Sequence, residues 1–141
     1  MTSIEEKQAE IVEDFSFLPQ WDERYAYLIE LGQKMEPLPD AHRAEENIVR
    51  GCQSTVWLQR ECRDGKVYLQ SDSDSLIVKG LAALLMAVYS GQPAEDILQA
   101  DLTFFEETGL NKHLSSQRAN GLMAMIDEIK AFSAKCAAGE A

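Results

Sequence analysis

The sequence predicts an α+β fold, in which a small antiparallel sheet of about three strands packs against several helices. Apolar residues follow helical spacing over residues 3–35 and again over most of the chain beyond residue 75, whereas residues 47–71 contain strand-like runs. Helices, then strands, then helices in one chain are typical of the α+β class.

The N-terminal part predicts two amphipathic helices. Ser3 and Glu6 form a capping-box pattern, and apolar residues from Ile4 to Leu18 then fall on one helical face. The second helix is expected over residues 21–35, where the pattern stops before a proline.

The middle of the chain predicts the sheet. Residues 55–63 and 66–71 are rich in β-forming residues, and Asp64-Gly65 fills the gap between them. Asp-Gly at a two-residue gap is the strongest short hairpin signal. A short strand at residues 47–49 is expected to supply the third strand.

A nearly all-apolar helix is expected after the hairpin. It begins near Ser75, is capped by Ser73 or Asp74, and ends at Gly91. Because it has almost no polar face, we expect it to be central and buried.

Three further helices are expected in the C-terminal part. Two short ones span residues 94–99 and 102–108, and the last opens at Ser115 or Ser116. The last helix carries an apolar stripe that includes Cys136.

Length and charge indicate one acidic globular domain over residues 1–141. The chain has 141 residues, is 45% hydrophobic, and carries 13 Lys and Arg against 24 Asp and Glu, a net charge of −11. This charge opposes binding to nucleic acid or anionic membranes. No secretory signal is visible, and the longest apolar run is far short of the roughly 18 residues of a membrane span, so we expect a cytoplasmic protein.

The cysteines and histidines predict neither a metal site nor a disulfide framework. Cys52, Cys62 and Cys136 are an odd number at wide spacing, and His42 and His113 have no partner at ligand spacing. We therefore expect three reduced thiols, no metal and no zinc site. Cys62 and Cys136 are expected to be structural or incidental.

Cys52 is the residue most suggestive of chemistry. Gly51-Cys52 joins two expected strands, so the thiol lies at a loop tip where it can meet a partner, and Gly51 permits a sharp turn. The alternative is a small apolar side chain filling space beneath the turn, which is the commoner role of an arbitrary cysteine.

Four stretches, in the same order as in the family, make the chain resemble the SufE sulfur-acceptor proteins of bacterial iron–sulfur cluster assembly. They are residues 21–25 with 29–32, residues 49–57, residues 72–74 with 77–81, and the set Leu110, residues 113–115, Arg118 and residues 120–122. The chain departs from the family at Ser116-Gln117, where Pro-Ser is common.

The resemblance implies a sulfur carrier that is not itself an enzyme and has no cofactor. A pyridoxal-phosphate (PLP) cysteine desulfurase of the SufS type would pass persulfide sulfur to Cys52 and be stimulated by this. The carrier would then deliver the sulfur to an iron–sulfur scaffold of the SufB type. The resemblance also implies an SufE/IscU-like fold and a bacterial cytoplasmic protein that is a monomer or weak homodimer.

The same resemblance suggests which residues support Cys52. Gly51, Gln53 and Ser54 belong to its loop, and Arg118 supports the loop or the partner interface. Asp74 either holds the resting loop or caps the helix that follows, and the sequence leaves both readings open.

Two other functions are weighed against the sulfur acceptor. An iron–sulfur scaffold needs about three thiolates, or a mixed ligand set, at one site. A thiol redox sensor needs a resolving cysteine, but Cys62 lies ten residues along an extended strand from Cys52, roughly 25 to 30 Å away. The acceptor interpretation is therefore preferred.

Overall fold

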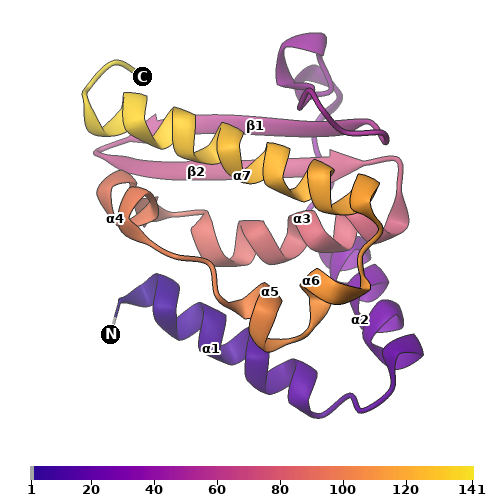
Figure 1. Ribbon diagram of the computed structural model, residues 1–141. Helices are drawn as coiled ribbons and strands as arrows, with labels where there is room; N and C mark the ends of the chain where they lie inside the picture. The colour runs from indigo at the N-terminus through magenta and orange to yellow at the C-terminus, as the bar shows by residue number, and fades with distance from the viewer. Residues whose placement is uncertain (1) are drawn as a thin grey trace.

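The computed structural model describes residues 2–141, which form seven α-helices and a three-stranded antiparallel sheet (Figure 1). The predicted α+β class is confirmed. No helix in the described residues is both long and apolar enough to cross a membrane. The helices are α1 Ser3–Ser16, α2 Trp21–Lys34, α3 Leu76–Tyr89, α4 Ala94–Gln99, α5 Phe104–Glu107, α6 Leu110–His113 and α7 Ser116–Ala137, and the strands are β1 Val56–Arg63, β2 Lys66–Ser73 and β3 Gln92–Pro93.

The two N-terminal helices lie where they are predicted, but the first cap is one residue earlier. Thr2 has an extended backbone, and its hydroxyl accepts a hydrogen bond from the Glu5 N–H at 3.2 Å. Thr2 and Glu5 repeat the spacing of Ser3 and Glu6, so the sequence contains two overlapping capping patterns. Ser3 is already the first helical residue.

The hairpin is confirmed with its predicted turn. β1 and β2 pair antiparallel from Val56 opposite Ser73 to Arg63 opposite Lys66. The two turn residues, Asp64-Gly65, have φ of 53° and 76°, as a tight two-residue turn requires.

The third strand is not the one predicted. Residues 47–49 make only an isolated bridge, from Ile48 to Trp57, whereas β3 pairs with the start of β2. Gly91 has a φ of 84°, which turns the chain back after α3, and its N–H donates to the Val67 carbonyl at 2.7 Å. A two-residue strand has no alternation from which to predict it.

Helix α3 is buried as predicted, with a different cap. Ser75, rather than Ser73 or Asp74, precedes the first helical residue, and its hydroxyl accepts from the Val78 N–H at 3.4 Å. The helix contacts α1, α2, α7 and β2, so it forms the centre of the core. Its buried apolar residues are Val78, Leu81, Ala82, Leu84, Leu85, Val88 and Tyr89.

The C-terminal part contains one helix more than predicted. The expected helix at residues 102–108 is the single turn α5, and Gly109, with a φ of 78°, separates it from α6. Helix α7 then crosses the face of the sheet (Figure 1) and contacts both β1 and β2. Ser115 is its N-cap.

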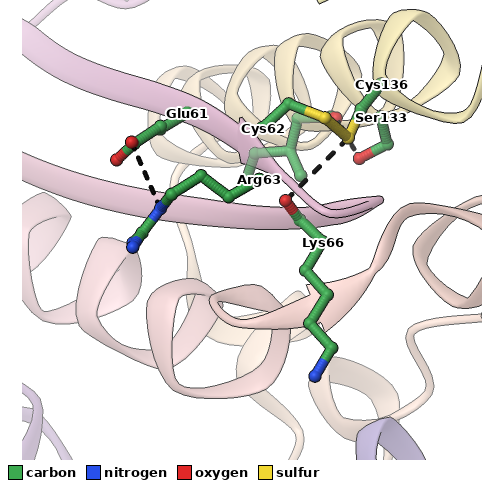
Figure 2. The surroundings of a disulfide bond; sticks show 7 residues. Glu61, Cys62, Arg63, Lys66, Ser133 and Cys136 are labelled. Carbon is green, nitrogen blue, oxygen red and sulfur yellow. Dashed lines mark hydrogen bonds and ion pairs between the residues drawn. A yellow bond between two sulfur atoms is a disulfide. The ribbon is translucent and has the colours of Figure 1, made fainter. Parts of the chain in front are cut away.

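A disulfide joins Cys62 of β1 to Cys136 in the last turn of α7, with their Cα atoms 5.7 Å apart (Figure 2). The expectation of three reduced thiols is therefore wrong for this pair. The two residues are 74 positions apart in sequence, so their spacing does not predict that they lie next to each other in the fold. Helix α7 brings its C-terminal end to the hairpin end of β1, within the usual separation for a disulfide.

Candidate functional site

Cys52 lies at the tip of a loop that rests on α7. The base of the loop is closed by a hydrogen bond from the Val49 N–H to the Val56 carbonyl at 2.9 Å. The Cys52 thiol is half-buried, and its Sγ donates to the Gly121 carbonyl of α7 at 3.6 Å. Cys52 is the cysteine outside the disulfide.

Small residues of α7 let the loop approach closely. A Cβ added at Gly121 would lie 3.4 Å from the Cys52 Sγ, an ordinary contact distance, so alanine would fit there but a side chain longer than alanine would displace the thiol. Gly51 has a φ of 92°, and a Cβ added to it would come no closer than 3.6 Å to Ala124. Gly51 is therefore required for its backbone conformation rather than for space.

The thiol opens into a pocket of about 300 Å³. Of the predicted site residues, Gln53, Ser54 and Arg118 line it together with Cys52. Sequence reasoning did not assign a site role to the other lining residues, although Ser115 and Gly121 lie in the C-terminal motif. These unassigned residues are Ser75, Val78, Ser115, Gln117 and Gly121.

Asp74 is hydrogen-bonded to Thr55, at the C-terminal end of the Cys52 loop. Its Oδ1 accepts a hydrogen bond from the Thr55 N–H at 3.1 Å, and its own N–H donates to the Thr55 carbonyl at 3.3 Å. The cap of α3 is Ser75, so the helix-cap reading of Asp74 is wrong. Asp74 does not line the pocket.

The N-terminal ends of α3 and α7 both border the pocket. Their N-cap residues, Ser75 and Ser115, are among its lining residues, and Arg118 adds a positive charge. Helix N-termini and guanidinium groups favour an anion. The departure at Ser116-Gln117 leaves this end intact, because the Ser115 hydroxyl still accepts from the Arg118 N–H at 3.2 Å.

Burial raises the pKa of the Cys52 thiol above its ordinary value. The resting pocket therefore favours the neutral thiol, which is a weak nucleophile. The two helix ends and Arg118 favour a negative charge in the same pocket, such as that of the Cys52 thiolate once it forms.

We expect iodoacetamide to alkylate Cys52 several-fold more slowly than glutathione at pH 7.5. Because the thiolate is the reactive form and the thiol pKa is raised, the rate should reach half of its plateau at a pH above about 8.5, where a free cysteine is half ionised. The measurement is mass-resolved alkylation kinetics between pH 6 and 10. A rate equal to that of glutathione across this range would show that the resting thiol is not protected.

The remaining predicted candidates do not join this site. Cys62 and Cys136 are paired to each other, the His42 carbonyl accepts from Asn47, and His113 stacks on Trp21. Within residues 2–141, no group of three or more His, Cys, Asp or Glu side chains is placed to hold a metal ion.

Fold and site together define a class of small α+β protein that presents one half-buried thiol on a loop between a sheet and a helix. The chain matches the SufE family, described as an Fe-S metabolism associated domain, over residues 9–133. It belongs to this family.

Similar proteins agree with this assignment. The chain is 44% identical over 135 residues to an uncharacterized SufE-like protein of Rhizobium meliloti (92% of this chain and 94% of the relative). It is 42% identical to one of Rhizobium etli (86% and 85%). A solution structure of a hypothetical protein from Thermus thermophilus is similar with a TM-score of 0.75 and 27% identity, over 92% of this chain and 95% of that one.

Proposed function

We propose that this SufE-family protein accepts sulfur on Cys52 from a PLP-dependent cysteine desulfurase of the SufS type and carries it to an iron–sulfur scaffold of the SufB type. It acts as a partner that speeds the desulfurase by removing the sulfur from it. We place this exchange in a bacterial cytoplasm, with the carrier as a monomer or weak homodimer.

The transfer is an exchange between a thiolate and a persulfide. The Cys52 thiolate attacks the outer sulfur of the desulfurase persulfide, so a bond forms between that sulfur and the Cys52 Sγ. The bond from the outer sulfur to the desulfurase cysteine breaks, and that cysteine leaves as a thiolate. The proton of the persulfide stays on the transferred sulfur, and no external oxidant or reductant is consumed.

The observation that carries the proposal is the environment of Cys52. Its thiol is outside the disulfide and half-buried on a loop tip, and it opens into a pocket bordered by Arg118 and two helix N-termini. Burial protects a persulfide from reductants. A loop position lets the sulfur reach into a partner's site, and the positive surroundings favour the anionic form that the persulfide takes when it loses its proton.

The two alternatives have weaker support. A scaffold that binds a cluster through three thiolates needs all three cysteines, but Cys62 and Cys136 are bonded to each other. The same bond removes Cys62 as a resolving partner for Cys52. In the proposed function, the residues that support the Cys52 loop or the partner interface are Gly51, Gln53, Ser54, Asp74 and Arg118.

The test is mass spectrometry after incubating the protein with a cysteine desulfurase and cysteine. We expect the intact protein to gain about 32 Da, the mass of one sulfur atom, and peptide mapping to locate the gain at Cys52. Omitting the desulfurase should remove the gain. A protein that gains no sulfur from any SufS-type desulfurase offered would contradict the proposal.

Asp74→Ala is expected to raise both the alkylation rate of Cys52 and the stimulation of the desulfurase. The change removes the side-chain acceptor of the Thr55 N–H, so the loop moves outward more often, by about 2- to 10-fold for the loss of one hydrogen bond. Asp74→Asn is the matched control, because its amide oxygen still accepts that bond. Equal alkylation rates in wild type and Asp74→Ala would rule out a holding role.

A further inference from the structure

The first turn of α2 holds the segment that precedes α7. The Trp21 ring stacks on the His113 imidazole with centroids 3.6 Å and planes 17° apart. The Tyr25 hydroxyl donates to the His113 carbonyl at 2.6 Å. Trp21 and Tyr25 are half-buried, whereas His113 is exposed. These contacts therefore fix a surface segment in place rather than fill the core.

A third side chain of the same turn holds the other end of this segment. Arg24 Nη1 donates to the Thr108 carbonyl at 2.7 Å, and its guanidinium lies 4.8 Å from the Trp21 ring centroid. A Cβ added at Gly109 would lie 3.3 Å from Trp21 Cζ2, so the ring lies directly against the turn. We call Trp21, Arg24 and Tyr25 the α2 clamp.

The segment held by the α2 clamp leads directly into the wall of the Cys52 pocket. A single residue, Leu114, separates His113 from Ser115, the N-cap of α7. Ser115 and Arg118 both line the pocket and are hydrogen-bonded to each other. A displacement of His113 is therefore passed to both, and it loosens the helix end against which Cys52 rests.

We propose that Trp21, Tyr25 and His113 are positioning residues for the Cys52 pocket, because they fix the start of α7 against the thiol. Any effect of these three residues on sulfur transfer rests on the function proposed above. Their effect on the alkylation rate of Cys52 does not, because alkylation needs no desulfurase.

The test compares two variants that weaken the contact with one that preserves it. Tyr25→Phe removes only the hydroxyl that holds the His113 carbonyl, and His113→Ala removes only the stacked ring. Each is expected to raise the Cys52 alkylation rate about 2- to 10-fold, as expected for the loss of one weak contact, at a temperature well below the melting transition. His113→Phe keeps a planar ring on Trp21 and should return the rate to within about 2-fold of wild type.

Tyr27→Phe is the matched control. Tyr27 lies on the same helix, but its hydroxyl bonds to Asp14 of α1 at 3.2 Å and does not reach the segment before α7. The proposal is wrong if Tyr25→Phe and His113→Ala alkylate at the wild-type rate, or if Tyr27→Phe accelerates alkylation equally. If the wild-type protein accepts no sulfur but Tyr25→Phe and His113→Ala still accelerate alkylation of Cys52, the positioning role is supported and the proposed function is refuted.

Discussion

Cys52→Ser is expected to reduce sulfur acceptance to background. The hydroxyl of serine cannot form the S–S bond that holds the transferred sulfur, so the gain of about 32 Da should disappear entirely. The fold should persist, because a half-buried Cys to Ser change costs about 1 kcal/mol. Intact-protein mass after incubation with desulfurase and cysteine measures the first effect, and thermal denaturation measures the second.

The matched control is the double variant Cys62→Ser/Cys136→Ser. It removes the disulfide and leaves Cys52 as the only cysteine of the three in the sequence, and it should still accept one sulfur. Removing the disulfide is expected to lower the free energy of unfolding by about 2–5 kcal/mol, so the assay belongs at a temperature where the variant is folded. Sulfur acceptance by Cys52→Ser at the wild-type rate would contradict the assignment of the carrier.

Local patterns in the sequence predict most of the elements and the position of the thiol. Asp64-Gly65 at a two-residue gap predicts the hairpin, and both turn residues adopt positive φ. Gly51-Cys52 predicts a loop tip because it joins two expected strands, although the first of these forms only the bridge from Ile48 to Trp57. Both features depend on residues adjacent in the chain. A local pattern is sufficient for them.

Features that depend on how distant elements meet are not visible in the sequence. Cys136 belongs to an apolar stripe, but the stripe does not indicate which strand its helix crosses, so it does not predict the bond to Cys62. Asp74 fits a helix cap by spacing, and only the hairpin register brings its carboxylate to the Thr55 N–H. The pocket likewise combines residues from the loop, α3 and α7.

Helices α2 and α3 cross at a pair of glycines, Gly32 and Gly80. A Cβ added at Gly80 of α3 would lie 2.6 Å from the Leu28 carbonyl carbon and closer still to its oxygen, both backbone atoms of α2. A Cβ added at Gly32 of α2 would lie 2.9 Å from the Gly80 nitrogen. Backbone atoms within helices cannot move aside singly, so the helices would have to separate.

Gly80→Ala is therefore expected to destabilise the protein by about 3 kcal/mol or more. Alanine gains about 1 kcal/mol of helix propensity over glycine, but the clash with the α2 backbone exceeds this gain. For a chain of this size the melting temperature should fall by about 10 °C, as measured by circular dichroism or calorimetry.

Gly32→Ala and Gly121→Ala complete a graded series with the same substitution in three helices. Gly32→Ala should cost less than Gly80→Ala, because one of its nearest contacts is the flexible Lys79 side chain, at 3.1 Å. Gly121→Ala meets only Cys52, at 3.4 Å or more, so it should keep or raise the melting temperature by helix propensity while changing Cys52 alkylation. If Gly80→Ala melts no lower than Gly121→Ala, α2 and α3 do not cross as closely as these contacts require.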